Sequence, residues 1–142
     1  MNILFFLKPK GDIVYIHDDE TMRQVLEKME YHRFTAIPMI SRETGAYMGT
    51  ITEGDLLWDI KNRCNLNLKA AEEIVIRDLK RHKDNQPVSA DADMEDLISK
   101  VVQQNFVPVI DSKKTFIGII TRRDVISYLL EQSRCPVRKG NL

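Results

Sequence analysis

Two short polar motifs of the same type are the residues best suited to chemistry in this chain. Thr52 and Asp55 form the first motif, and Thr121 and Asp124 form the second, each at a predicted corner between a strand and a helix. A carboxylate beside a hydroxyl at a helix start can accept hydrogen bonds from a cis-diol such as that of ribose. The same spacing is also that of a capping box, which satisfies the first backbone N–H groups of a helix. The spacing leaves both ligand binding and helix capping open.

The residues between the threonine and the aspartate give the two motifs different charges. The first motif has Glu53-Gly54 in this place, and the second has Arg122-Arg123. Because a guanidinium group matches phosphate oxygens and a carboxylate repels them, we expect the Asp124 motif to favour a phosphorylated ligand. Lys8 and Lys80 are further candidates for phosphate contacts. The alternative is that these basic side chains are solvated surface residues.

Residues that could support catalysis or bind a metal are scattered along the sequence. His17, His32 and His82 have no spacing typical of a ligand set or a proton relay, and Cys64 and Cys135 form no Cys-x-x-Cys pair. The sequence has no nucleophile-elbow, P-loop or paired-carboxylate motif. We therefore expect no enzyme activity, no metal and no catalytic cofactor. The isolated cysteines suit a reducing cytosol.

Composition and charge limit the possible partners. The 142 residues include 21 Lys and Arg against 21 Asp and Glu, and 43% of them are hydrophobic. Neither half of the sequence has the basic excess typical of nucleic-acid binders, and the basic segment 134–139 is short. No apolar run approaches the ~20 residues of a membrane span. We therefore expect a cytoplasmic globular protein whose partners are neither membranes nor nucleic acids.

An internal repeat accounts for most of the sequence. Three segments of the first half recur in the same order in the second half, displaced by 72, 70 and 69 residues: Leu7–Asp12 as Leu79–Asp84, Ile37–Ile40 as Val107–Ile110, and Gly49–Asp55 as Gly118–Asp124. Agreement in order, residue type and spacing indicates two copies of one structural unit. Each copy alone would bury only a marginal core, so we expect the two to pack together with pseudo-two-fold symmetry. A cleft between them is the expected ligand site.

Each copy is expected to begin with a short strand, and the helix that follows it has an amphipathic pattern. Apolar residues at positions i, i+3, i+4 and i+7 form one stripe in the first copy: Met22, Val25, Leu26 and Met29. Thr21 and Gln24 predict a capping box at the start of this helix, and Asp93 predicts the cap of its counterpart.

The remaining elements of each copy are two strands and a second helix. In the first copy the strands are predicted at 36–40 and 47–52, the former at a sheet edge or as a strand start because it contains a proline. The second helix is predicted at 56–62, with its counterpart at 125–131. A helix over 66–75 is expected to join the copies. The fold class is therefore α+β, with two β-α-β-β-α repeats.

These motifs resemble those of the CBS (cystathionine-β-synthase) domain family, in the tandem arrangement called a Bateman module. The resemblance rests on Pro-Met-Ile followed by Gly-Thr-Ile-Thr-x-x-Asp in the first copy, and on Val-Pro-Val-Ile followed by Gly-Ile-Ile-Thr-x-x-Asp in the second. It implies one repeat over residues 1–68 and another over 69–142, with a C-terminal tail from about residue 133. Such pairs typically bind adenosine-containing ligands, with ribose held by the threonine and aspartate of each motif.

The resemblance also implies positions for the adenine ring and for a dimer contact. By position, adenine would contact apolar residues of two strands in each copy: Ile16, Ala36 and Ile37 in the first, and Val88, Phe106 and Val107 in the second. A place in the hydrophobic core is the more common role for each of these residues. CBS pairs commonly form homodimers, and exposed apolar side chains are expected at Leu57, Trp58, Val125 or Leu129.

The implied function is that of a regulatory module. It would bind AMP, ADP or ATP in the cleft between the repeats and transmit a conformational or oligomeric change to an effector protein in trans. One alternative is a sensor of S-adenosylmethionine. Another is a ligand-independent dimerising scaffold, in which the Thr-x-x-Asp motifs only cap helices.

Overall fold

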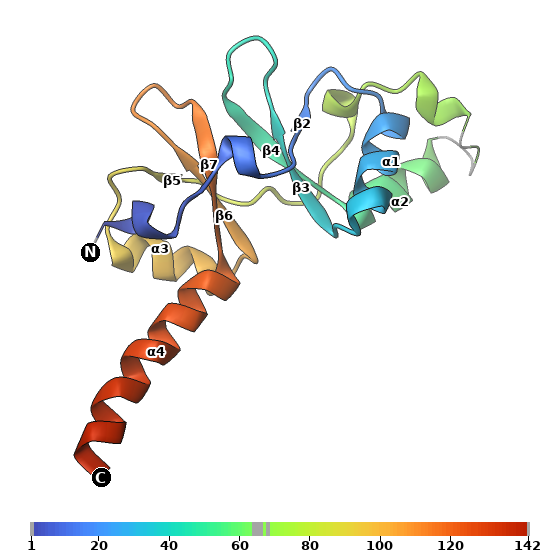
Figure 1. Ribbon diagram of the computed structural model, residues 1–142. Helices are drawn as coiled ribbons and strands as arrows, with labels where there is room; N and C mark the ends of the chain where they lie inside the picture. Colours follow the sequence, from blue (N-terminus) through green and yellow to red (C-terminus); the bar gives the residue numbers. More distant parts are fainter. Residues whose placement is uncertain (1, 64–66, 68, 142) are drawn as a thin grey trace. The chain divides into compact units, whose positions relative to one another are not determined.

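The computed structural model describes residues 2–63, 67 and 69–141 (Figure 1). Its strands are β1 (Lys8–Pro9), β2 (Ile16–His17), β3 (Ala36–Ile40), β4 (Tyr47–Thr52), β5 (Val88–Ser89), β6 (Phe106–Ile110) and β7 (Phe116–Thr121). Its α-helices are α1 (Met22–His32), α2 (Glu53–Asn62), α3 (Met94–Val101) and α4 (Arg122–Asn141). The α+β class and the repeated order of elements are confirmed.

The segment that joins the repeats contains short 3-10 turns at Ala70–Glu72 and Ile76–Asp78. The prediction of a helix over 66–75 is wrong for the described residues of this range, because they form only a single 3-10 turn. Cys64 and the start of the predicted helix at Leu66 lie outside the described residues.

The described residues pack as two compact units that each combine distant parts of the sequence. The first-repeat unit comprises Val14–Asn85 and Lys114–Phe116. The second-repeat unit comprises the described residues before Val14, together with Gln86–Lys113 and the chain from Ile117 onward. The N-terminal segment, which the sequence assigns to the first repeat, thus packs with the second.

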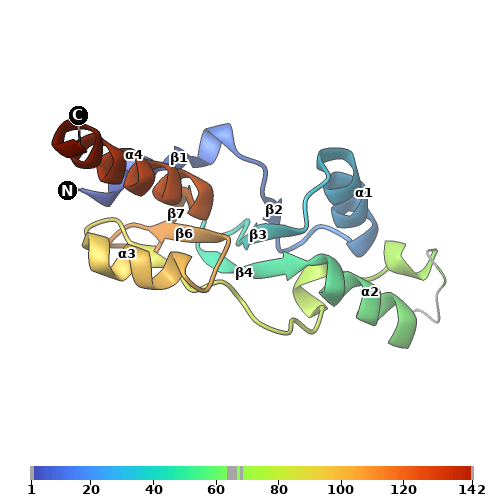
Figure 2. The same ribbon diagram turned by 90° about the horizontal axis from the view of Figure 1, so that it is seen from below.

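The first-repeat unit is built on a three-stranded sheet in the order β2-β3-β4. Strand β2 runs parallel to β3, β3 runs antiparallel to β4, and α2 continues directly from the end of β4 (Figure 2). The core contains three of the four residues of the predicted α1 stripe, with Leu26 packed partly buried against it. The other members come from the sheet, from α2 and from the segment 76–79, and the full set is Ile16, Met22, Val25, Met29, Ile37, Met39, Ile51, Leu56, Ile76 and Leu79. The capping box of Thr21 and Gln24 is present as predicted.

Strand β3 lies in the middle of its sheet, so its prediction as an edge strand was wrong. Pro38 pairs with Thr50 of β4, whereas the two-residue strand β2 reaches only Met39 and Ile40. The proline therefore has no β2 residue opposite it, and its missing N–H removes no hydrogen bond from that side of the sheet.

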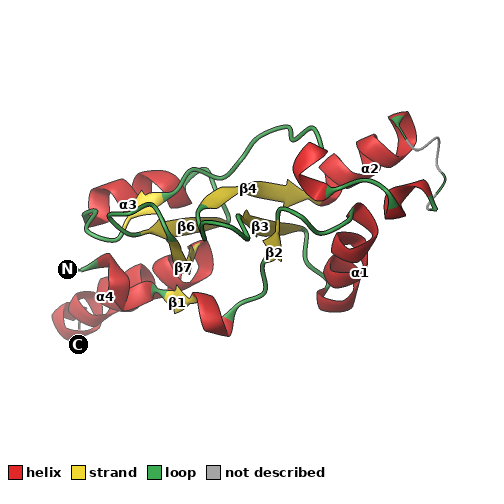
Figure 3. Ribbon diagram, turned by 90° about the horizontal axis from the view of Figure 1, so that it is seen from above, coloured by secondary structure: helices red, strands yellow, loops and turns green. Residues whose placement is uncertain are grey.

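The second-repeat unit has a four-stranded sheet in the order β1-β7-β6-β5. Strand β1 pairs antiparallel with β7, β5 runs parallel to β6, and α3 packs beside β6 (Figure 3). Two N-terminal side chains complete its core: Ile3 and Phe6 join Val88, Leu97, Val101, Val107, Val109, Ile120 and Val125. The rings of Phe5, Phe6 and Tyr128 meet edge to face, with centroids 5.1–5.6 Å apart.

Helix α4 is longer than predicted and includes most of the expected C-terminal tail. It runs from Arg122 to Asn141, whereas the pattern predicted a helix over 125–131 and a tail from about residue 133. Gln132 and Arg134, which follow the end of the repeat, are good helix formers and allow the helix to continue there. Neither this helix nor any other among the described residues has the length and apolar character needed to span a membrane.

Candidate functional site

The first Thr-x-x-Asp motif forms a complete capping box at the start of α2. Thr52 Oγ1 accepts a hydrogen bond from the Asp55 backbone N–H at 3.1 Å, and Asp55 Oδ2 accepts one from the Thr52 backbone N–H at 3.1 Å. Asp55 is only 5% exposed. Helix capping, the alternative that the spacing left open, thus takes place at this motif.

The other oxygen of Asp55 has a partner outside the helix. Asp55 Oδ1 accepts a hydrogen bond from the backbone N–H of His82 at 3.0 Å. His82 belongs to Arg81–Asn85, which we call the clasp segment and which precedes the first strand of the second repeat. Both carboxylate oxygens of Asp55 are therefore engaged by backbone donors.

Further polar contacts hold the clasp segment against β4. Asp84 Oδ1 accepts hydrogen bonds from the Thr50 backbone N–H at 3.0 Å and from Arg81 Nε at 2.7 Å. A Cβ atom added at Gly49 would lie 2.6 Å from the same oxygen, so the glycine is needed for this close approach. The sequence indicated neither Arg81 nor Asp84 as a functional residue, although Asp84 is the repeat counterpart of Asp12.

Tyr47 joins the end of the clasp segment to β4. Its hydroxyl donates to the Asn85 carbonyl oxygen at 2.7 Å and lies 2.6 Å from Thr50 Oγ1. Burial raises the pKa of the Tyr47 phenol well above its ordinary value, with a smaller contribution from the nearby carboxylate of Asp84. The phenol therefore stays protonated and keeps its role as a donor.

The second Thr-x-x-Asp motif is more open than the first. Thr121 Oγ1 accepts from the Asp124 backbone N–H at 3.2 Å, which caps the start of α4. The Asp124 side chain is 40% exposed, and its Oδ2 lies 3.6 Å from Nζ of Lys8, whose side chain is 49% exposed. Lys8, a predicted phosphate contact, thus lies beside Asp124, the predicted ribose-binding residue of this motif.

The two arginines of the second motif have different surroundings. Arg122 Nε donates to the carbonyl oxygens of Val101 at 2.7 Å and Gln104 at 3.1 Å, at the end of α3. Arg122 Nε therefore caps carbonyls at and just after the end of α3. The phosphate contact of Arg122 stays a prediction, and it would have to come from the two terminal nitrogens of the guanidinium group. Arg123 is exposed next to Asp124 and stays available to an anion.

Gln104 is a structural residue that the sequence did not indicate. It is buried, and its side-chain amide accepts from the Gln86 backbone N–H at 2.7 Å and donates to the Gln86 carbonyl at 3.1 Å. These bonds attach the segment before β5 to the end of α3. Lys80, the remaining phosphate candidate, is exposed just before the clasp segment.

Most residues predicted to contact adenine lie in the cores of the two units. Ile16, Ile37 and Val107 have no exposed surface, and Val88 and Phe106 retain 5% and 7%. Ala36, at the start of β3, is half-buried. The fully buried side chains have no surface that a ligand could contact, so their role is to pack beneath the residues that do.

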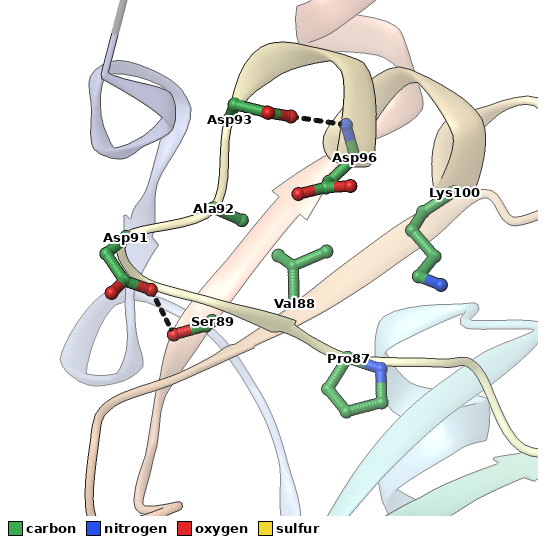
Figure 4. Close-up of a pocket in the computed structure, with 8 residues that line it drawn as sticks. All are labelled: Pro87, Val88, Ser89, Asp91, Ala92, Asp93, Asp96 and Lys100. Atoms are coloured by element: carbon green, nitrogen blue, oxygen red, sulfur yellow. Dashed lines mark hydrogen bonds between the residues drawn. The ribbon is translucent and has the colours of Figure 1, made fainter.

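A hollow of about 500 Å³ lies beside the start of α3 in the second-repeat unit (Figure 4). Its lining contains one predicted site residue, Val88, among Pro87, Ser89, Asp91, Ala92, Asp93, Asp96 and Lys100. Three carboxylates and one ammonium group make it unsuited to phosphate. Among the described residues, no group of three His, Cys, Asp or Glu side chains could hold a metal ion.

The predicted apolar surface is present in part. Leu57 and Trp58 are each 57% exposed on α2, and Leu129 is 41% exposed on α4. Val125 is fully buried in the second core, so its prediction as a surface residue was wrong. Val125 directly follows the motif and is the first apolar residue of α4, where its side chain packs against the sheet.

Solved structures share the fold of this chain at low sequence identity. CbpB in complex with c-di-AMP has a TM-score of 0.86 and 22% identity, over 98% of this chain and 91% of that one. CbpB from Streptococcus agalactiae has a TM-score of 0.80 and 22% identity, over 93% and 82% of the two chains. CBSX2 in complex with AMP has a TM-score of 0.72 and 21% identity, over 93% and 98%.

The family assignment rests on sequence. No curated protein matches the chain. The model of the CBS domain, in contrast, matches it twice, over residues 7–62 and 72–131, which together include both Thr-x-x-Asp motifs. The chain belongs to the CBS domain family, as a tandem pair of CBS domains.

Proposed function

We propose that this chain is a regulatory module that binds an adenine nucleotide and passes the resulting change to a partner protein. The observation that carries the proposal is the second motif, where the half-exposed carboxylate of Asp124 lies beside Thr121 and near Lys8. Two similar structures, CbpB and CBSX2, hold c-di-AMP and AMP, which both contain adenosine.

The chemistry of the second motif suits a nucleotide. The Asp124 carboxylate can accept hydrogen bonds from both ribose hydroxyls, because its only ion pair in the described residues is the exposed contact with Lys8. Lys8 and Arg123 supply positive charge for the phosphate. Adenine would lie against β5 and β6, where Val88 and Phe106 retain a small exposed area.

The same charges favour phosphorylated ligands over S-adenosylmethionine. The sulfonium group of S-adenosylmethionine is a cation, and it would meet the cationic side chains of Lys8 and Arg123 in place of a phosphate. AMP, ADP, ATP and c-di-AMP all present phosphate oxygens to these side chains. We therefore expect S-adenosylmethionine to bind more weakly than any of them.

The output of the module is proposed to be delivered through protein contacts. Leu57 and Trp58 on α2, and Leu129 on α4, are apolar side chains that a homodimer would cover. An effector protein in trans would then read the change in shape or assembly. A ligand can drive such a change only by binding the two states with different affinity.

Titration calorimetry with AMP, ADP, ATP, c-di-AMP and S-adenosylmethionine tests the proposal. Asp124→Ala should weaken binding of the best ligand by about 2–3 kcal/mol, because it removes charge-assisted hydrogen bonds to ribose. The second candidate function is a ligand-independent scaffold, which the capping role of Asp55 favours. It predicts that none of these compounds binds.

A further inference from the structure

We infer that the two Thr-x-x-Asp motifs have separate roles, so that the chain binds one nucleotide and not two. The Asp124 motif takes the nucleotide, whereas the Asp55 motif binds the chain's own clasp segment, Arg81–Asn85. The inference that the ligand is a nucleotide rests on the proposed function. The inference that only one binds per chain rests on the contacts of Asp55.

The hydrogen-bonding capacity of Asp55 is the first argument. One oxygen accepts from the Thr52 backbone N–H and the other from the His82 backbone N–H, and the residue is 5% exposed. A ribose that bound this carboxylate would displace at least one of these donors and leave a backbone N–H without a partner in a region closed to water. The His82 N–H donates to Asp55 Oδ1, as a ribose hydroxyl would donate to the aspartate of a nucleotide-binding motif.

The anion beside the motif is the second argument. The Asp84 carboxylate accepts from the Thr50 backbone N–H at 3.0 Å, only two residues before Thr52. Arg81 forms an ion pair with this carboxylate at 2.7 Å. The clasp segment thus provides a backbone donor for Asp55 and a negative group for the adjacent strand. An incoming phosphate would meet Glu53, which would repel it, and an Arg81 guanidinium group whose charge the Asp84 carboxylate already neutralises.

The second motif lacks this arrangement. Its matching N-terminal segment pairs through the backbone, with Lys8 opposite Ile119 and Pro9 opposite Gly118. A Cβ added at Gly118 would lie 2.2 Å from the Lys8 carbonyl oxygen, so the approach is as close as that at Gly49. Side-chain contact with Asp124, however, is limited to the exposed 3.6 Å pair with Lys8 within the described residues.

The charges separate the motifs further. Asp12, the counterpart of Asp84, is exposed, and among the described residues it forms no ion pair with the second motif. An exposed ion pair such as that of Lys8 with Asp124 adds little stability. Lys8 can therefore turn from the carboxylate to a phosphate while ribose takes its place at Asp124. At Asp55 no such replacement is available, because both carboxylate oxygens accept from backbone N–H groups of the chain.

Titration calorimetry of the full chain with AMP and with c-di-AMP tests the inference, using the matched variants Asp55→Asn and Asp124→Asn. We expect no more than one nucleotide per chain. Asp124→Asn should weaken binding at least about tenfold, while Asp55→Asn should leave the affinity within about twofold. Thermal unfolding of the same samples should show the opposite order, with the larger loss of stability in Asp55→Asn.

Two nucleotides per chain, or an equal loss of affinity in both variants, would overturn the inference and leave the proposed function standing. Failure of the unsubstituted chain to bind either nucleotide would overturn both. If Asp55→Asn does not fold, His82→Pro removes the same N–H donor without changing the carboxylate. Its affinity and its stoichiometry of one should match those of the unsubstituted chain, and a loss of affinity as large as that of Asp124→Asn would overturn the inference.

Discussion

The buried carboxylate of Asp55 accepts a hydrogen bond from the backbone of His82, at 3.0 Å and 27 residues away in the sequence. Together with the capping bond from Thr52, it uses both oxygens of a side chain that the family resemblance assigned to ribose. The same motif in the second repeat has an aspartate whose carboxylate, within the described residues, meets only the exposed ammonium group of Lys8, at 3.6 Å. The two copies of one sequence motif thus differ in what they can bind.

Asp55→Asn should destabilise the fold. The amide group would place an NH₂ against a backbone N–H at either Thr52 or His82, so one buried donor loses its acceptor. We expect a loss of about 2–4 kcal/mol in the free energy of unfolding, measured by urea denaturation. The control is Glu53→Gln in the same helical turn, which is exposed and should cost less than ~1 kcal/mol. Equal effects of the two substitutions would contradict the clasp.

Substitution of the two neighbouring arginines should separate stability from binding. Arg122→Ala removes hydrogen bonds to the Val101 and Gln104 carbonyls and should cost about 1–3 kcal/mol in stability. Arg123→Ala should leave stability unchanged and weaken ATP binding by ~1 kcal/mol, about fivefold, because its side chain is exposed beside Asp124. Chemical denaturation and calorimetry measure the two effects. Weaker stability in Arg123→Ala than in Arg122→Ala would refute this division of roles.

Tyr47 should make the fold sensitive to alkaline pH. Its pKa is raised by burial, so the unfolded chain loses the phenol proton near pH ~10 while the folded chain keeps it. The unfolded state then binds fewer protons, and the free energy of unfolding falls as pH rises above about 10. Tyr47→Phe should be less stable at neutral pH by about 1 kcal/mol and should lose part of this slope. Denaturation between pH 8 and about 11 measures it, and parallel curves would argue against the prediction.

The exposed apolar side chains of α2 should support a homodimer. Trp58 is 57% exposed, and Trp58→Glu would put a charge into any contact that covers it. We expect light scattering to report a dimer for the unsubstituted chain and a monomer for the variant. Lys113→Glu is the control, since it places a glutamate at an exposed turn between β6 and β7, outside α2 and α4. A dimer that survives in Trp58→Glu would place the contact elsewhere.

The repeat made much of the fold predictable. Because the same pattern occurs twice, each helix and strand had a counterpart to support it. Of the predicted stripe, Met22, Val25 and Met29 are buried and Leu26 is partly buried. The prediction failed where elements are too short to show a periodic pattern of apolar residues. Strand β2 has two residues, so the proline of β3 could not be recognised as lying in a central strand.

The candidate site was predictable as a set of residue types but not as two different sites. Thr-x-x-Asp fits a capping box and a ribose contact equally well, and the difference lies in the environment of each carboxylate. His82 reaches Asp55 through its backbone, which leaves no signal in residue type. Arg122 was assigned to phosphate from its residue type, because its own motif does not indicate the Val101 and Gln104 carbonyls that its Nε meets.

The account is tested most directly by a crystal structure of the chain with AMP. We predict ribose hydroxyls within about 2.5–3.0 Å of the Asp124 carboxylate, with the Lys8 ammonium moved toward the phosphate. Asp55 should still accept hydrogen bonds from Thr52 and His82, with no nucleotide beside it. A nucleotide whose ribose contacts Asp55, or one bound away from Asp124, would contradict the account.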